Sequence, residues 1–310
     1  MIYIIMCTYN GEKYIEEQLD SIANNSISDW MLFVKDDCST DSTLEKVRIF
    51  EQRFPERVRI IKNPKQQGAA FNFLSMTYEI GKLISDDDFV MLCDQDDVWN
   101  VNKVEITLQK MREMTTEYGN SIPLLVCSDV EVVDENLKVI AKSFKDMNHY
   151  NAKKIDFSHL MMENKVQGCT TMINKAFISK LKQLPEHVCM HDGWMGLIAS
   201  TMGKIAYIEQ TTMRYRQHSK NVLGSVGFWQ DVKQKFSCLS EQKEIVFGSS
   251  QQVKEFLSIY EKELDQYCLH AAKAFATLEE QNFFMKRFHI IKYHMWKSGI
   301  IRNIGLLFLI

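Results

Sequence analysis

The sequence predicts an α/β fold in which helices cover both sides of a mostly parallel sheet, followed by a helical region. Short continuous apolar runs, typical of strands buried on both faces, alternate with segments whose apolar residues recur at helical spacing. All four prolines lie within the first 185 residues, and Gly248 is the only glycine between Gly227 and Gly299. The chain is therefore interrupted often up to about Gln217 and rarely after it.

The expected elements follow from these runs. Strands are predicted at residues 2–7, 31–34, 58–61 and 89–93. Helices are predicted at about residues 15–22, 42–54, 69–83 and 104–111. The second of these helices begins with a capping box formed by Ser42 and Glu45, whose side chains would accept hydrogen bonds from free backbone N–H groups. Strands and helices that alternate in this way favour a sheet covered on both sides.

Acidic residues follow two of these strands directly. Asp36 and Asp37 come after the second strand, and the run Asp94–Asp97 comes after the fourth. In such sheets, ligands bind at the carboxyl ends of the strands. Three carboxylates within four residues repel one another unless a cation neutralises them, and such oxygen ligands suit Mg²⁺ or Mn²⁺ bound together with substrate phosphates. The sequence favours this metal site over a solvated acidic turn before the next helix.

The loop after the first strand, Cys7–Gly11, is expected at the same edge of the sheet. The Tyr9 ring can stack on a nucleotide base, and a carboxylate such as Asp37 can accept hydrogen bonds from a base imide or a ribose hydroxyl. The alternative is an ordinary turn at Asn10, with Asp36 capping a helix.

Composition limits the class of protein. The 310 residues are 45% hydrophobic and 25% charged, which suits a folded protein with a sizeable core. The net charge of −3 gives no general attraction to nucleic acid. The eight cysteines contain no C-x-x-C pair, and the first strand begins at Ile2 without room for a secretory leader. We therefore expect a cytoplasmic protein with reduced thiols.

Several motifs between Ile2 and Gly224 resemble, in order and spacing, those of the family 2 glycosyltransferases, which have the GT-A fold. The opening run IIMCTYNGEKYIEEQLDSI and the element VKDDCSTDST resemble the first motifs of these enzymes, and CDQDDVW resembles their metal-binding D-x-D motif. Later segments resemble motifs of bacterial members identified as rhamnosyl- or related transferases: VQGCTTMIN, MHDGW and YRQHSKNVLG.

The resemblance implies transfer of a sugar from a nucleoside-diphosphate sugar, and it assigns residues to that donor. Tyr9 would lie against the base, Asp37 would bind the base or the ribose, and Asp94 would contact the ribose or the sugar. The other residues expected at the donor are Thr8, Asn10, Gln67, Gly168 and Arg216. A dTDP- or UDP-sugar is the favoured donor.

The resemblance also implies a metal ion and a catalytic base. Asp96 would bind the Mn²⁺ or Mg²⁺ that bridges the diphosphate, with His218 near it as a further ligand. Asp192 would be the general base for the acceptor hydroxyl, because an alcohol is a poor nucleophile at neutral pH. A single base on the face opposite the leaving group implies inversion at the anomeric carbon.

Five residues near this site also have an ordinary structural interpretation. Trp99 and Trp194 are expected to form the walls of an acceptor site, with plain packing as an equal alternative. Gly168 either lets the donor sugar approach the backbone or forms a bulge, and His191 is more readily a packing or capping residue than a partner of the base. Cys38 stands where the family commonly has Gly, and its Cβ disfavours a left-handed backbone.

The last part of the sequence is predicted to be helical. An apolar stripe from Val253 to Tyr267 predicts an amphipathic helix that packs on the catalytic domain. Residues 285–303 carry five Lys or Arg residues and no acid, beside an apolar face that includes Phe284 and Phe288. A basic amphipathic helix followed by the apolar segment 305–310 suits an anionic membrane surface, and a packed helix or a homodimer contact is the alternative.

We expect residues 1–225 to form a catalytic GT-A domain, with a donor half at about 1–100 and an acceptor half at about 101–225, and residues 226–310 to be helical. The predicted function is metal-dependent, inverting transfer of a hexose or rhamnose to a glycan or lipid-linked acceptor. It would serve bacterial surface polysaccharide synthesis at the inner face of the cytoplasmic membrane. The rivals are a non-catalytic subunit that binds sugar nucleotides and a nucleotidyltransferase, which usually needs a basic Gly-rich loop that Thr8–Gly11 lacks.

Overall fold

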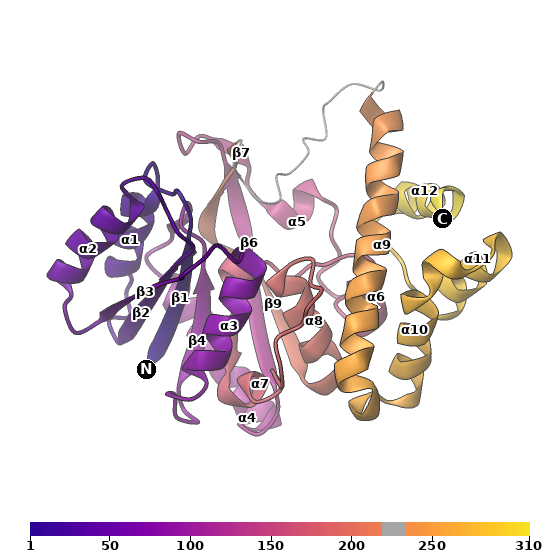
Figure 1. Ribbon diagram of the computed structural model, residues 1–310, viewed down its shortest axis with the longest axis horizontal. Coiled ribbons are helices and arrows are strands. Elements are labelled where there is room, and N and C mark those ends of the chain that lie inside the picture. The colour runs from indigo at the N-terminus through magenta and orange to yellow at the C-terminus, as the bar shows by residue number, and fades with distance from the viewer. Residues whose placement is uncertain (219–233) are drawn as a thin grey trace.

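The computed structural model describes residues 1–218 and 234–310 and has a nine-stranded sheet with helices on both faces (Figure 1). The strands lie in the order β3-β2-β1-β4-β8-β6-β9-β5, and β7 pairs with β6. Their bounds are β1 (Ile2–Thr8), β2 (Trp30–Asp36), β3 (Val58–Lys62), β4 (Phe89–Cys93), β5 (Val98–Trp99), β6 (Leu124–Val133), β7 (Val139–Ala141), β8 (Met172–Asn174) and β9 (Lys204–Arg216). The predicted α/β class is confirmed.

The half of the sheet formed by β3, β2, β1 and β4 is parallel, with β1 between β2 and β4. These strands are apolar on both faces because both faces are covered. In β1, Ile4 and Met6 belong to the core on one face and Ile5 belongs to the core on the other. The four strands predicted from apolar runs are confirmed, and β4 has the predicted bounds.

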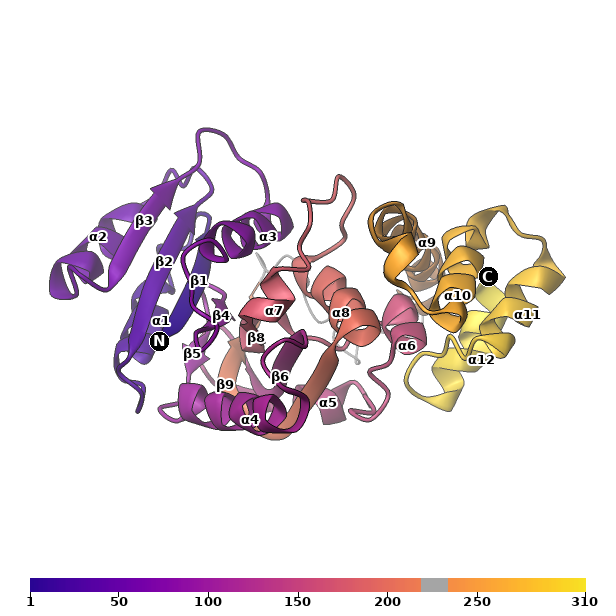
Figure 2. The ribbon, with the colours of Figure 1, turned by 90° about the horizontal axis from the view of Figure 1, so that it is seen from below.

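Helices form a layer on each side of this sheet. The core on one face includes residues of α1 (Ile15–Ala23), α2 (Thr43–Arg53) and α4 (Lys103–Tyr118). The core on the other face includes residues of α3 (Ala69–Ile80) and α8 (His191–Met202), which Figure 2 shows on the side away from α4. The layers leave the carboxyl ends of the parallel strands at one edge of the sheet.

The predicted capping box before α2 is wrong. Ser42 precedes the helix, but its side chain accepts no hydrogen bond there. The carboxylate of Asp41 accepts the backbone N–H of Thr43 instead, with a distance of 3.0 Å. The Thr43 hydroxyl also accepts the backbone N–H of Gly11 at 2.8 Å, so the start of α2 is joined to the loop after β1.

The other half of the sheet contains antiparallel pairs, so the sheet as a whole is mixed. β8 lies between β4 and β6 and runs antiparallel to both, whereas β6 and β9 are parallel. Because β8 runs in the direction opposite to β4, the segment before it reaches the edge where β4 ends. That segment is a short 3₁₀ helix, η1 (Gly168–Thr170), and the backbone N–H of Leu92 donates to the Thr171 carbonyl at 3.0 Å.

The remaining helices include the helical region predicted after the sheet. Their bounds are α5 (Phe144–Met147), α6 (Phe157–Met162), α7 (Lys175–Ile178), α9 (Gln234–Tyr260), α10 (Gln266–Ala276), α11 (Phe283–Lys292) and α12 (Ile300–Leu309). The predicted amphipathic stripe is divided, because Asp265 starts α10 by accepting the backbone N–H of Cys268 at 2.7 Å. Within residues 1–218 and 234–310, no helix has the length and apolar character to cross a bilayer. The domain boundary predicted at residue 225 and the motif residues 219–224 lie outside the described residues.

Candidate active site

The candidate site lies at the edge of the sheet where β1, β2 and β4 end. Three loops meet at this edge: residues 9–11 after β1, residues 37–41 after β2 and residues 94–97 after β4. The start of α8 reaches the same place, because the backbone N–H of Gly168 donates to Oδ2 of Asp192 at 3.2 Å. One edge therefore gathers residues from motifs that are far apart in the sequence.

Asp96 and His218 are in direct contact at this edge, although 122 positions separate them. Nε2 of His218 lies 2.8 Å from Oδ2 of Asp96. The imidazole ring stacks on Tyr14, with ring centroids 4.8 Å apart. The structure thus brings together the two residues that the sequence suggested as metal ligands.

Asp94 and Asp97 form a tight group with Cys169, in which ligand atoms of the three residues lie within 4.8 Å of one another. Burial, followed by the charges of Asp96 and Asp94, raises the pKa of Asp97 well above its usual range. Burial likewise raises the pKa of the Cys169 thiol. A thiol is a soft ligand, and it suits a hard divalent cation less well than a carboxylate does.

Two sets of residues at this edge could therefore hold a divalent cation: Asp96 with His218, and Asp94 with Asp97 and Cys169. Burial and the charges of Asp96 and Asp192 raise the pKa of Asp94 to about 7. Burial is the larger cause of this shift, and a divalent ion would oppose the part that comes from the neighbouring carboxylates. Carboxylate oxygens are suitable ligands for both Mn²⁺ and Mg²⁺.

Arg216 holds the loop after β4 in place. Its backbone N–H donates to Oδ1 of Asp97 at 2.9 Å, and its Nε donates to the Asp96 carbonyl at 2.8 Å. The two terminal nitrogens donate to the Glu135 carbonyl, at 2.7 Å, and to the Glu17 carboxylate. All three nitrogens of the buried guanidinium therefore donate to protein acceptors, and these contacts support the loop.

Asp192 is the second residue of α8, and its carboxylate is held by backbone groups. Oδ1 accepts the N–H of Gly193 at 2.7 Å, and Oδ2 accepts the N–H of Gly168. Burial raises the pKa of Asp192 to about 6, while these hydrogen bonds and one from the Asn164 side chain oppose the rise. A carboxylate with a pKa near 6 is ionised at neutral pH and is basic enough to accept a proton from an attacking alcohol.

His191, next to Asp192, is a packing residue. Its ring is almost fully buried and stacks on Phe73, with centroids 4.2 Å apart. Burial lowers the pKa of His191 to about 3, so the ring is neutral. A Cβ at Gly168 would overlap Nε2 of His191, so this glycine is needed for the close approach of the imidazole.

The loop after β1 is fixed by its polar residues and leaves one ring exposed. The Thr8 hydroxyl donates to Oδ1 of Asp36 at 2.9 Å, and Oδ1 of Asn10 accepts the Thr40 N–H at 2.9 Å. The Tyr9 side chain, in contrast, is 44% exposed. Of these predicted donor residues, Tyr9 has the surface that a nucleotide base could cover.

Asp37 is buried and binds the loop before α3. Its carboxylate accepts hydrogen bonds from Nδ2 of Asn63 and from the backbone N–H groups of Gln67 and Gly68, each at 2.8 Å. Burial opposes ionisation, but these bonds hold the pKa of Asp37 below its usual range. Cys38 beside it has φ 68°, so the loop keeps the left-handed conformation that the expected glycine would favour.

The two tryptophans do not form an acceptor wall, which corrects that prediction. Trp99 is 3% exposed and belongs to the core on the α4 side of the sheet. Trp194 is fully buried and packs against Phe256 and Tyr260 of α9, with ring centroids 5.5 and 6.2 Å away. Neither ring has the free surface that stacking on a sugar requires.

Three supporting residues were missed from the sequence. Gln95 joins two loops, because its side chain accepts the Tyr9 N–H and donates to the Tyr9 carbonyl, each at 3.0 Å. Tyr14 lies under both His218 and the Arg216 guanidinium, and Asn164 bonds to Asp192. The position of Gln95 between two aspartates was the only signal that could have identified any of them.

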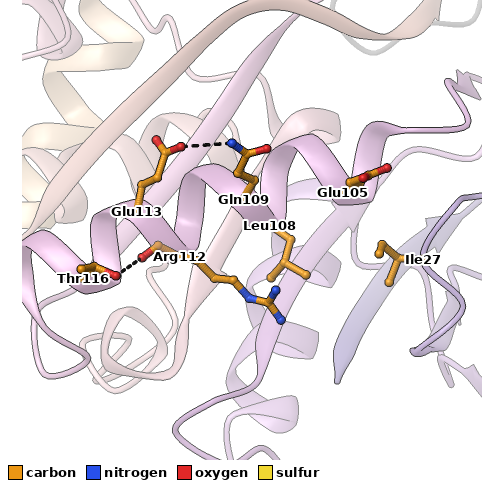
Figure 3. Close-up of a pocket in the computed structure, with 7 residues that line it drawn as sticks. All are labelled: Ile27, Glu105, Leu108, Gln109, Arg112, Glu113 and Thr116. Atoms are coloured by element: carbon orange, nitrogen blue, oxygen red, sulfur yellow. Dashed lines mark hydrogen bonds between the residues drawn. The ribbon is translucent and has the colours of Figure 1, made fainter.

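A separate pocket of about 530 Å³ lies along α4, and it is not part of this edge (Figure 3). Its lining comes from α4 and Ile27, and Figure 3 shows Gln109 hydrogen-bonded to Glu113 along the helix. It contains none of the predicted site residues. The candidate active site is therefore defined by the loops at the strand ends.

Comparison with known proteins identifies relatives. Residues 3–123 match the family described as Glycosyl transferase family 2. Over 229 residues the chain is 30% identical to the dTDP-rhamnosyl transferase RfbG of Shigella flexneri, which covers 71% of this chain and 74% of that protein. Over 176 residues it is 27% identical to UDP-Glc:alpha-D-GlcNAc-diphosphoundecaprenol beta-1,3-glucosyltransferase WfgD of Escherichia coli, which covers 56% of this chain and 59% of that protein.

The fold is also found among solved structures. The mannosyltransferase PcManGT from Pyrobaculum calidifontis, in complex with GDP-Man and Mn²⁺, superposes with a TM-score of 0.54 over 99% of this chain and 78% of that chain. The two sequences are 14% identical, so this likeness concerns the fold alone. The resemblance seen in the sequence motifs is confirmed. The chain belongs to glycosyltransferase family 2 and has the GT-A fold.

Proposed function

We propose that the protein is a metal-dependent, inverting glycosyltransferase that moves a hexose or rhamnose from a nucleoside-diphosphate sugar to a hydroxyl of a glycan or lipid-linked acceptor. The observation that carries this proposal is the meeting, at one edge of the sheet, of the Asp96–His218 pair and the backbone-held carboxylate of Asp192. The process would be bacterial polysaccharide synthesis. In support, the relatives RfbG and WfgD are named as transferases of rhamnose from dTDP and of glucose from UDP.

The donor would bind across the ends of β1, β2 and β4. The exposed Tyr9 ring would cover the base, and Asp37 would fix the loop around Gln67 that borders the base and ribose. We favour dTDP or UDP as the nucleotide because these are the nucleotides named for RfbG and WfgD. Asp94 would reach the ribose or the sugar from the adjacent strand.

Asp96 and His218, with Asp94 beside them, would hold Mn²⁺ or Mg²⁺. When bound, the ion supplies positive charge for the diphosphate that leaves with the nucleotide. Arg216 keeps this loop in place through its contacts with the Asp96 carbonyl and the Asp97 carboxyl group. The fold neighbour PcManGT, solved with GDP-Man and Mn²⁺, supports a metal of this kind.

Asp192 would accept the proton of the acceptor hydroxyl as that oxygen attacks the anomeric carbon. The N–H groups of Gly168 and Gly193 hold the carboxylate in one orientation before the acceptor arrives. With one base and no second carboxylate proposed as a nucleophile, the reaction is a single displacement that inverts the anomeric centre. A positioned base of this kind typically contributes about 10²–10⁴-fold to the rate.

We also propose that residues 1–225 are the catalytic unit, with the donor half at about 1–100 and the acceptor half at about 101–225, and that residues 226–310 are a helical region. The enzyme would work in the cytoplasm, at the inner face of the cytoplasmic membrane. The acceptor named for WfgD, a diphosphoundecaprenol lipid, supports an acceptor held in a membrane.

The test is the Asp192→Asn variant. Asparagine preserves the shape of the side chain and cannot act as a base, so transfer should fall by about 10²–10⁴-fold while donor binding is kept. Release of nucleotide from UDP- and dTDP-sugars in the presence of an acceptor extract measures transfer, and calorimetry measures donor binding. The exposed Asp146 provides the control variant Asp146→Asn. Full transfer by Asp192→Asn would remove Asp192 from the role of base.

A further inference from the structure

Two helices at one end of the molecule expose large apolar side chains to solvent. Figures 1 and 2 both place α11 and α12 at the end opposite α2. On α12, the exposed fractions are 81% for Ile300, 85% for Ile301, 52% for Ile304 and 85% for Phe308. On α11, they are 79% for Phe284, 52% for Phe288 and 54% for Ile291. We call these seven residues the α11–α12 surface.

The exposed residues form stripes on helices that are themselves well anchored. Except for the adjacent pair Ile300 and Ile301, they are three or four positions apart, which places them on one side of each helix. The other side of α12 is packed, because Leu306 and Ile310 are buried in the core that includes α9 and α10. The stripes are therefore a second apolar face, in addition to the one that the fold uses.

Positive charge surrounds this surface. Lys243, Lys286, Arg287 and Lys292 form no ion pair with the side chains of residues 1–218 and 243–310. Lys243 and Lys286 both lie 5.4 Å from the ring centroid of Phe247. Burial first, and then the charges of Lys243 and Arg287, lower the pKa of Lys286, while the charge of Glu279 raises it, so the repulsion among these cations is only partly offset. Anionic groups from outside the protein would relieve that repulsion.

The same surface is tied to the neighbourhood of Asp192. The buried carboxylate of Glu163 accepts the backbone N–H of Ser298 at 2.8 Å and pairs with Arg302 on α12. The next residue, Asn164, hydrogen-bonds to Asp192. One short segment thus holds both the start of α12 and the carboxylate proposed as the base.

We propose that the α11–α12 surface docks on an anionic lipid bilayer, with its apolar side chains inserted among the lipid headgroups and its lysine and arginine side chains on the lipid phosphates. This proposal rests on the proposed function, because the purpose of docking would be to bring Asp192 to an acceptor carried by a membrane lipid. Exposed apolar stripes flanked by cations are the features of helices that bind in the bilayer interface.

A second copy of the chain fits this surface less well than lipid does. A symmetric dimer through the α11–α12 surface would bring the four cations of each copy close to those of the other. Like charges across an interface oppose association, whereas an anionic bilayer neutralises them. We therefore assign the surface to lipid and use the oligomeric state as a test.

The experiment is sedimentation of the full chain with vesicles. One preparation contains equal parts of phosphatidylglycerol and phosphatidylcholine, and the other contains phosphatidylcholine alone. The wild type should bind the anionic vesicles. The double variant Ile301→Glu with Phe308→Glu should bind them at least about ten-fold more weakly, because it places two charges where apolar side chains enter the interface. Lys286→Gln and Lys292→Gln should each weaken binding by about five-fold.

The matched control is Ile49→Glu with Leu83→Glu, two exposed apolar residues of the N-terminal half that should leave vesicle binding unchanged. Thermal melting and nucleotide binding verify that each variant is folded. The proposal is overturned if the wild type does not bind anionic vesicles, or if the Ile301/Phe308 variant binds them as the wild type does. It is also overturned if that variant only converts a dimer to a monomer. Asp192→Asn should bind vesicles normally, which separates this result from a failure of the proposed function.

Discussion

The loops after β2 and β4 both carry paired aspartates at the same edge of the sheet, yet the protein uses them differently. After β2, protein groups satisfy the carboxylates: Thr8 and Ser39 donate to Asp36, and Asn63 donates to Asp37 together with two backbone N–H groups. The pKa of Asp37 is accordingly held low.

After β4, the carboxylates face one another. Burial, Asp96 and Asp192 raise the pKa of Asp94 to about 7, and Asp96 has the His218 ring as its partner. The same residue type after a strand therefore builds a closed scaffold in one loop and, in the other, a group of carboxylates at which we propose that a cation binds. The difference comes mainly from donors on other segments, such as Thr8 and Asn63, although Ser39 in the same loop also donates to Asp36.

The largest effect should come from the loop after β4. Asp96→Asn removes a charged metal ligand, so Mn²⁺ should no longer enhance nucleotide binding, and transfer should fall at least about 100-fold. Calorimetry with UDP and dTDP, with and without Mn²⁺, measures the first effect. Unchanged metal enhancement in this variant would move the metal away from Asp96 and remove the contrast between the two loops.

The closed loop should respond in stability instead. The Asp37 carboxylate accepts three hydrogen bonds. In Asp37→Asn, the amide NH₂ group faces at least one of the three N–H donors, so that hydrogen bond is lost and the free energy of unfolding should fall by about 2 kcal/mol. Because the folded-state pKa of Asp37 is low, its contribution is present above the usual aspartate pKa and is lost as pH falls. Urea unfolding at neutral and acidic pH measures both. A variant as stable as the wild type would contradict the scaffold role.

The pH dependence of sugar transfer should follow the ionisation of Asp192, the proposed base. A base must be ionised, and burial raises the pKa of Asp192 to about 6, so kcat/KM should fall about ten-fold per pH unit below that value. Asn164→Ala removes a hydrogen bond that favours the ionised form of Asp192, so the fall of kcat/KM at acidic pH should begin at a higher pH in this variant. If the variant shows the same acidic pH dependence as the wild type, a group other than Asp192 controls the fall of kcat/KM.

The smallest effect should come from Cys38→Gly. Glycine relieves the left-handed backbone at φ 68°, but it adds freedom to the unfolded chain, so the free energy of unfolding should change by less than about 1 kcal/mol. Urea midpoints of the two proteins measure this, with nucleotide binding as the functional control. A large loss of stability would mean that the contact of the Cys38 thiol with the Asn63 carbonyl matters more than the backbone strain.

The parallel half of the fold could be predicted from the sequence because each strand there is a local apolar run. The place of β8 between β4 and β6 could not, because antiparallel pairing of three residues depends on segments far along the chain. The same limit applies to the site. Asp94, Asp96 and Asp192 stand in motifs, whereas Gln95, Tyr14 and Asn164 act through partners that the fold supplies.

Burial explains why residue type alone did not predict the surroundings of some residues near the site. Trp99 and Trp194 have the chemistry of a sugar-stacking wall, but the sheet and α9 cover them. Arg216 also has protein partners at Asp96, Glu135 and Glu17, and its predicted place near the diphosphate stays a prediction. Aromatic and basic residues serve a core as readily as a ligand, and only their neighbours decide which.

The double hydrogen bond between the Gln95 amide and the Tyr9 main chain has a consequence for ligand binding. It joins the segment expected beneath the base to the segment that carries the metal ligands, so a shift in one is transmitted to the other. We expect a nucleotide at the Tyr9 end and a cation at the Asp96 end to influence each other's affinity, and thermodynamic reciprocity would make the two changes equal. Nucleotide and cation would bind as cooperative partners, held together by a single glutamine side chain.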